Sequence, residues 1–180
     1  MDAPLSQLVE RARRRDERAW AELVSRHAGL VWSVARAHRL GEADAADVAQ
    51  ATWMTLLEHI HDVREPAAVG GWIATAARRE CLRVLRRRER VVISAETPER
   101  ADDAAELDAR LLTSERDRAL WAAFRRLGAR DQALLRMLTA DPAPSYEEIG
   151  AALGMPIGSI GPTRARALER LRCQLDAQVA

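Results

Sequence analysis

The stretch from residue 145 to residue 171 constrains the fold of this chain more than any other. Ser145 and Glu148 have the spacing of a capping box, which marks the start of a helix with apolar side chains on one face. The tripeptide GMP at 154–156 then interrupts the helical pattern, and a second amphipathic helix is expected over roughly 160–175. So short a break requires a sharp angle between two packed helices, which predicts a helix-turn-helix.

An apolar stripe and a polar face divide the second helix. At about 100° per residue, Ile160, Ala167 and Leu171 form the inner stripe. Arg164 also falls on the inner side, so its head group must snorkel outwards or the first turn must be irregular. Hydroxyls and arginines on the other face are the groups that contact base edges and phosphates, although a solvated helix end looks similar. The DNA-binding residues expected here are Ser159, Thr163, Arg164, Arg166 and Arg170.

A proline close to the start of this helix needs a separate explanation. With Ser159 as the N-cap, Pro162 occupies the third helical position. An N–H group at that position has no partner within a helix, so its absence costs nothing. We therefore expect Pro162 to be part of the helix start.

Helical spacing dominates the rest of the chain, and no run of alternating β-branched residues occurs. The sequence therefore predicts an all-α protein. Asp44 is expected to be the N-cap of the third helix, with Asp47 in its first turn. The expected helices are 5–14, 17–39, 45–61, 71–89, 115–126, 130–138, 146–153 and 160–175.

The charge distribution predicts two small helical domains joined by an acidic flexible linker. Residues 1–92 hold 16 Arg against 13 Asp and Glu, and residues 113–180 hold 10 against 8, so both are weakly basic. Residues 93–112 hold 2 Arg against 6 acidic residues and include a proline. We assign 1–92 and 113–180 as domains and 93–112 as the linker.

A second basic face lies on the helix that follows Gly70-Gly71-Trp72. Its apolar residues cluster on one side, and its arginines cluster on another. Glu80 and Glu89 do not share the arginine face, so counter-charges are not expected along it. The face is expected to contact a nucleic-acid backbone and consists of Thr75, Arg79, Arg83, Arg86 and Arg90.

These motifs, in this order, resemble an extracytoplasmic-function sigma factor of the bacterial sigma-70 family. The segment "DAADVAQATWMTLLEHI" is similar to part of region 2, and "GGWIATAARRECLRVLRRR" is similar to its promoter-binding helix. The segment "SYEEIGAALGMPIGSIGPTRARALERLR" is similar to region 4. The resemblance implies a protein that binds core RNA polymerase and promoter DNA, opens the duplex at initiation and performs no covalent chemistry.

The resemblance also assigns site residues by position. Docking on the β′ subunit of core polymerase is implied for Asp44, Asp47, Val48, Gln50 and Met54, with the β subunit as a further partner. The loop 61–70, with Arg64, corresponds to the segment that captures an unstacked base of the −10 element. The arginine face that ends at Arg90 would grip the −10 strand, and the face from Ser159 to Arg170 would bind the −35 element. An anti-sigma factor, common in the family, is a further expected partner.

The chain departs from the family pattern at two places. The usual "ARN…D" reads Ala77-Arg78-Arg79 here, with Arg83 at the aspartate position, so an unusual −10 preference is expected. The common "VKSRLHRAR" is replaced by "IGPTRARAL", which places Arg164 where an aliphatic side chain is usual.

Other classes of function are less well supported by the residues. A helix-turn-helix regulator that acts without polymerase would explain 113–180 but leave the first basic face without a role. His59 and His61 are two positions apart and so poorly placed to share a metal, and neither cofactor nor metal is expected. Cys81 and Cys173 have no paired spacing, no apolar run reaches about 20 residues, and a cytoplasmic protein without membrane contact is expected.

Overall fold

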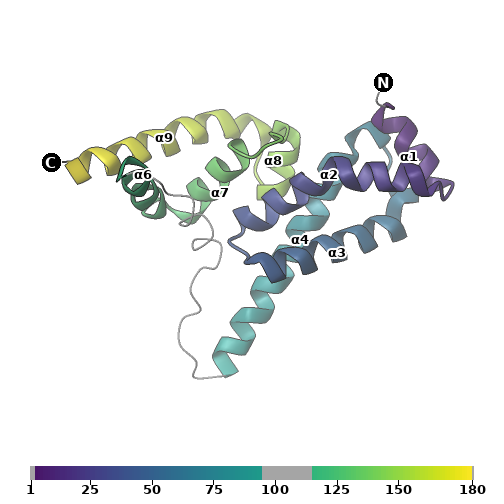
Figure 1. Cartoon of the computed structure of the whole chain (residues 1–180), viewed down its shortest axis with the longest axis horizontal. Coiled ribbons are helices and arrows are strands. Elements are labelled where there is room, and N and C mark those ends of the chain that lie inside the picture. The colour runs from purple at the N-terminus through teal and green to yellow at the C-terminus, as the bar shows by residue number, and fades with distance from the viewer. Residues whose placement is uncertain (1–2, 95–114, 180) are drawn as a thin grey trace.

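The computed structural model describes residues 3–94 and 115–179, and every regular element among them is a helix (Figure 1). The first part contains α1 (Leu5–Arg13), α2 (Glu17–Ala37), α3 (Glu42–His59), two 3-10 turns η1 (Ile60–Asp62) and η2 (Pro66–Ala68), and α4 (Val69–Ser94). The second part contains α6 (Glu115–Arg125), α7 (Ala129–Leu138), α8 (Tyr146–Leu153) and α9 (Ile157–Val179). The all-α prediction is confirmed, and all eight expected helices are present, α8 with its expected bounds and the other seven with one or both ends shifted.

Local side-chain caps explain where two of the helices begin. Asp16 caps α2, because its carboxylate accepts hydrogen bonds from the backbone N–H groups of Arg18 at 3.0 Å and Ala19 at 3.1 Å. These backbone bonds and the guanidinium of Arg11 lower the pKa of Asp16. The predicted capping box of α8 is confirmed, with both hydrogen bonds between Ser145 and Glu148 formed.

The start of α3 differs from the prediction. Gly41, with extended backbone angles, is the N-cap, so Asp44 lies inside the first turn and is not the cap. Glu42 and Ala43 are compatible with helix, and the helix therefore extends three residues further toward the N-terminus than expected. The Asp44 carboxylate instead pairs with Arg88 of α4.

The start of α9 also differs from the prediction. The helix begins at Ile157, so Ser159 lies in its first turn, where its hydroxyl donates to the carbonyl of Pro156 at 2.7 Å. Pro162 is consequently inside the helix and not at its start. Without an N–H group it cannot bond the carbonyl of Gly158, so the helix lacks one hydrogen bond there.

Two hydrophobic clusters hold the helices together. The larger cluster is built on residues such as Leu23, Leu56 and Ile73 in the first part and continues into Ile149 and Ala152 of α8. The smaller cluster lies between α6, α7 and α9, where Phe124 stacks on Trp121 with ring centroids 5.1 Å apart. The two predicted domains therefore pack against each other through one continuous core.

The contact between α4 and α8 joins the two parts (Figure 1). Two glycines allow the close approach: a Cβ on Gly70 would lie 2.1 Å from the Glu148 carboxylate, and one on Gly154 would lie 2.7 Å from the Arg78 guanidinium. Gly154 also has the left-handed conformation that ends α8, with φ of 63°. His38, the C-cap of α2, adds a bond between its Nε2 and the Ala152 carbonyl at 3.3 Å.

The structure can be compared with only part of the predicted domain boundaries. α4 runs to Ser94, two residues past the predicted end of the first domain. Residues 95–114, which hold most of the predicted linker, lie outside the described residues.

Two classes of feature are absent from the described part of the chain. No helix in 3–94 or 115–179 is both long and apolar enough to cross a membrane. In the same residues, no three His, Cys, Asp or Glu side chains gather as a metal site would require.

Candidate functional site

The exposed face of α4 carries the first predicted set of arginines. Arg79, Arg83, Arg86 and Arg90 all have exposed side chains, whereas Ile73, at the opposite side of the helix, is fully buried. The helical spacing predicted from the sequence therefore places these four cations at the surface. Thr75 is partly buried, and its hydroxyl donates to the Gly71 carbonyl at 2.9 Å.

The expectation that counter-charges are absent from this face is wrong at one position. Glu80 reaches Arg83, with 2.6 Å between the carboxylate and a guanidinium nitrogen, because residues three apart are neighbours on a helix. The Arg86 guanidinium folds back on the Leu82 carbonyl at 3.1 Å. Arg83 is 71% exposed, so its pair with Glu80 is a weak surface ion pair that a stronger anion can replace.

The loop between α3 and α4 lies at the start of this face and contains the two 3-10 turns. Ile60, Val63 and Val69 are buried and anchor the loop, while Arg64 is exposed as predicted. Arg13 of α1 also anchors the loop, because its guanidinium donates hydrogen bonds to the carbonyls of Ile60 and Val63. No local pattern in the sequence identifies Arg13, which lies 47 positions from Ile60.

One face of α3 presents acidic, amide and apolar side chains to solvent. Asp47 and Gln50 are exposed, and Met54 is 53% exposed. Leu57 is 54% exposed on the same face and was missed by the sequence reasoning, although its spacing of three residues from Met54 could have identified it. We call Asp47, Gln50, Met54 and Leu57 the α3 stripe.

Two residues predicted with this face have other surroundings. Val48 is 1% exposed and belongs to the core, so its assignment to a binding surface is wrong. Asp44 is only partly exposed and is engaged by Arg88. Val48 is buried because helical spacing places it on the same side of α3 as the buried residues Thr52 and Leu56.

The polar face of α9 is narrower than predicted. Ile160 and Ala167 are fully buried as expected, but Thr163 is also buried, at 8% exposure, so its assignment to the DNA-binding face is wrong. The buried stripe is centred on the Thr163 side of the helix, which turns Arg164 outward instead of inward. Arg164 is therefore exposed.

The remaining predicted residues of α9 differ in what they contact. Ser159 is partly exposed, and Arg166 is exposed with one guanidinium nitrogen 3.2 Å from the Thr163 hydroxyl. Arg170 donates to the Asp131 carboxylate of α7 at 2.6 Å. The Asp131 side chain is 9% exposed, so this pair stabilises the second part of the chain as well as placing a cation at its surface.

The first turns of α9 leave room for a close partner. Nothing lies within 4 Å of where a Cβ would be at Gly158 or Gly161. The N-terminal end of a helix carries unpaired N–H groups and a positive dipole end, and both favour phosphate. α9 therefore combines a small, open N-terminal end with the exposed cations of Arg164 and Arg166.

Comparisons with known proteins agree with this arrangement. The family model for sigma-70 region 2 matches residues 23–91, which include most of α2, all of α3 and most of α4. The ECF RNA polymerase sigma factor SigE of Mycolicibacterium smegmatis is 29% identical over 164 residues, covering 86% of this chain. The chain spans 60% of the length of that relative.

Two solved structures share the fold. CnrH, in complex with the cytosolic domain of CnrY, superimposes with a TM-score of 0.67 at 21% identity, covering 97% of this chain and 99% of that one. The sigma factor RpoE of Bartonella quintana, in complex with the anti-sigma factor NepR, gives a TM-score of 0.57 at 21% identity, with 83% and 92% coverage. Both parts of the chain thus have the helical arrangement found in these proteins.

Proposed function

We propose that this chain is a member of the extracytoplasmic-function group of the sigma-70 family, which binds core RNA polymerase and directs it to promoters. The observation that carries the proposal is the exposed row of four arginines on α4, inside the segment that matches the family model. The protein acts by binding DNA and polymerase in the cytoplasm and performs no covalent chemistry of its own.

The α3 stripe is the proposed contact with core polymerase. Met54 and Leu57 each expose about half of their side chain, and burial of the remainder against a partner would contribute about 1 kcal/mol each. Asp47 and Gln50 add a negative charge and a hydrogen-bonding amide beside them. The stripe fits a helical partner that combines apolar and basic side chains, which is the chemistry implied for the β′ subunit.

The face of α4 is the proposed contact with the −10 element. Phosphates would be neutralised by Arg79, Arg83, Arg86 and Arg90. The loop that contains Arg64 would receive an unstacked base at the N-terminal end of α4. Thr75 lies on the same side of the helix but is partly buried, so its contribution is limited to one hydroxyl oxygen.

The N-terminal half of α9 is the proposed contact with the −35 element. Arg164 and Arg166 are exposed, and Ser159 is partly so, close to the open surface of Gly158 and Gly161. We assign base-edge contacts to these three residues. We assign Arg170 to a phosphate contact, because Asp131 already engages part of its guanidinium.

Transcription with purified components tests the proposal. Core polymerase from a GC-rich bacterium is incubated with and without the protein over a fragmented genomic library, and the RNA 5′ ends are sequenced. We expect transcripts that begin downstream of a shared motif only when the protein is present. Sequence-specific DNA binding by the free protein, without such transcripts, would instead favour a regulator that acts without polymerase.

The α3 stripe is tested by a charge reversal with a matched control. Asp47→Arg with Gln50→Arg adds three positive charges to the stripe, and Glu17→Arg with Ala21→Arg adds the same charge to exposed positions of α2. We expect the first variant to lose at least about tenfold in affinity for core polymerase while the second keeps wild-type affinity. Equal binding by both variants in a pull-down titration would remove the stripe from the interface.

An anti-sigma factor is a further proposed partner, since CnrH and RpoE were solved in complexes with CnrY and NepR. A groove of about 630 Å³ lies between α2 and the helices α6, α7 and α9. Its apolar lining includes Leu120, Trp121 and Leu168, and Leu120 and Leu168 are each 44% exposed. We expect Leu168→Asp to weaken binding of an anti-sigma segment, measured by calorimetry, without changing affinity for core polymerase.

A further inference from the structure

Arg13 of α1 is one of the most heavily bonded side chains in the first part of the molecule. Its Nε donates to the Ile60 carbonyl at 3.1 Å, and its Nη2 donates to the Val63 carbonyl. Its Nη1 pairs with Glu10 at 2.5 Å. The side chain is only 18% exposed, so these bonds form in a partly desolvated position where they are stronger than at the surface.

The two carbonyls that Arg13 holds lie at the two ends of one loop turn. Ile60 is the C-cap of α3, where helix carbonyls lack internal partners and a cation is favoured. Val63 begins the extended stretch after η1, with ψ of 101°. One guanidinium therefore fixes both the exit from α3 and the direction in which the loop continues.

The loop presents its other side to solvent. Ile60 and Val63 are 3% and 4% exposed and point into the core, whereas His61, Asp62 and Arg64 are exposed between and beside them. α1 also packs against η1 and η2. The loop is thus held by buried side chains and by Arg13, and its exposed tip is left for a ligand.

From this geometry we infer that Arg13 is a positioning residue that preorganises the α3–α4 loop to receive an unstacked base. The inference rests on the proposed function, in which this loop captures a base of the −10 element. A pocket for a flipped base has to exist before the base arrives, because ordering the loop at that moment would reduce the affinity. Arg13 supplies that order without touching DNA itself.

The planar fork of arginine matters for this role. It directs several N–H donors in fixed directions and can hold two carbonyls at once, whereas a lysine ammonium is a single point charge. Arg13→Lys keeps the charge and much of the packing but cannot reproduce both backbone contacts. It therefore separates positioning of the loop from the general stability of α1.

The experiment measures whether removal of the captured base still lowers the affinity of the variant holoenzyme for promoter DNA. Once the promoter is known, holoenzyme affinity is titrated on DNA whose −10 non-template strand is single-stranded, with each −10 base in turn replaced by an abasic nucleotide. For wild-type protein we expect a loss of about tenfold at one position, as for removal of a bound base. Arg13→Ala and Arg13→Lys are compared with Arg26→Ala as the control.

Arg26 is a matched control because it also ties two segments, donating to the Ala3 carbonyl at 2.9 Å and to Glu22, but does not contact the loop. We expect Arg13→Ala to bind intact DNA about tenfold more weakly and to show no further loss at the abasic position. Arg13→Lys should also bind intact DNA more weakly and lose less affinity than wild type at the abasic position. Arg26→Ala should keep the wild-type affinity for intact DNA and the full wild-type loss at the abasic position.

The outcomes separate the inference from the function on which it rests. If Arg13→Ala or Arg13→Lys folds, as judged by thermal unfolding, and keeps the full wild-type loss at the abasic position, Arg13 does not position the loop. Wild-type holoenzyme without sensitivity at any −10 position would overturn the inference as well. Absence of promoter-dependent transcripts with wild-type protein would instead show that the proposed function is wrong.

Discussion

Among individual residues, the arginines of this chain divide into those that face solvent and those that carboxylates or carbonyls engage. Arg164 is exposed, whereas Arg170 is bonded to Asp131, whose side chain is 9% exposed. The sequence analysis assigns both to the DNA-binding residues of α9, and no local pattern separates their roles. A buried carboxylate without its partner costs free energy, so Arg170 contributes to stability whether or not it contacts DNA.

A pair of substitutions distinguishes the two roles. We expect Arg170→Ala to lower the free energy of unfolding by about 1–2 kcal/mol, because it leaves the Asp131 carboxylate unpaired. Arg166→Ala removes only the 3.2 Å contact with the Thr163 hydroxyl and should change it by less than about 0.5 kcal/mol. Urea unfolding of both variants measures the difference, and equal stabilities would mean that the Arg170 pair contributes nothing.

Single elements show how far local sequence rules extend. The capping box starts α8 as predicted, because both of its hydrogen bonds join Ser145 and Glu148, which are only three positions apart. The pattern Ser-Ile-Gly-Pro resembles a capped start and predicts Ser159 as the N-cap of this helix. The helix begins at Ile157 instead, directly after Pro156, and accommodates Pro162, which follows Gly161, in its second turn.

Replacement of Pro162 tests this description of α9. Pro162→Ala would restore the missing hydrogen bond to Gly158, and we expect it to raise the free energy of unfolding by about 1 kcal/mol. For a chain of this size the unfolding temperature would rise by about 2–4 °C. Pro156→Ala is the control, because Pro156 precedes the first helical residue and should give no gain. If neither variant is stabilised, the proline does not interrupt the helix.

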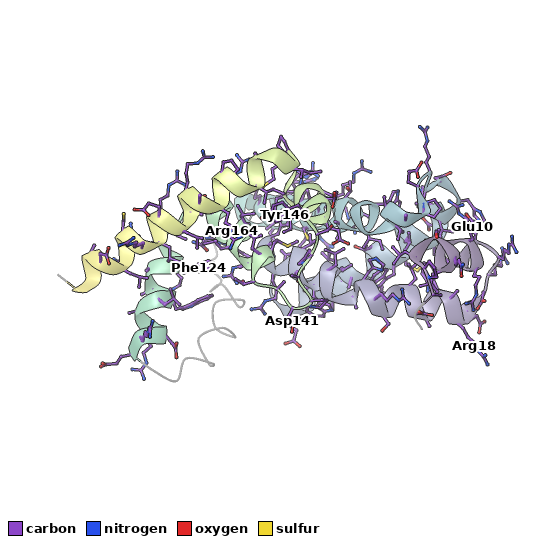
Figure 2. The ribbon with its side chains drawn as sticks, turned by 90° about the horizontal axis from the view of Figure 1, so that it is seen from above. Glu10, Arg18, Phe124, Asp141, Tyr146 and Arg164 are labelled. Carbon is purple, nitrogen blue, oxygen red and sulfur yellow. The ribbon has the colours of Figure 1, made fainter. Side chains whose placement is uncertain are left out.

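Across the whole molecule, the two parts form one body in the free protein. α8 packs on α4, and α9 begins four positions after α8 ends, so the proposed −10 and −35 contacts lie within a few helix diameters, about 10 Å each, of one another. Promoter elements centred near −10 and −35 lie about 25 base pairs, or about 85 Å, apart. If the chain acts as proposed, the packing of α8 on α4 must therefore open before both elements are bound. Figure 2 shows the extent of the packed form, with Arg18 at one end and Phe124 toward the other.

His38 makes the contact between the two parts sensitive to pH. Burial lowers the pKa of His38 from its ordinary value of 6.5, and the charge of Arg78 adds to this, although the Ala152 carbonyl opposes it. The unfolded chain therefore binds the proton first as the pH falls, so the contribution of His38 is present above pH 6.5 and is lost as the pH falls through the lowered folded-state pKa.

We expect acidification from pH 7.5 to 5.5 to lower the unfolding temperature of the wild-type protein more than that of His38→Gln, whose amide can keep a bond to Ala152. His61→Gln changes an exposed histidine of the loop and should behave like wild type. Differential scanning calorimetry at the two pH values gives the comparison. Parallel curves for all three proteins would contradict a role for His38 in the contact.

The sequence alone determined the elements of this protein, because caps, helical periodicity and the break at 154–156 depend on neighbours within a few positions. It also placed four arginines on one exposed face of α4, and Ile160 and Ala167 in the buried stripe of α9, but it put Thr163 on the polar face and Arg164 on the inner side. Only the tertiary structure decided which charges are engaged. The pairs of Arg170 with Asp131, Arg88 with Asp44, and Arg13 with Ile60 are 39, 44 and 47 positions apart. Contacts at such separations depend on how whole helices pack, and no local pattern encodes them.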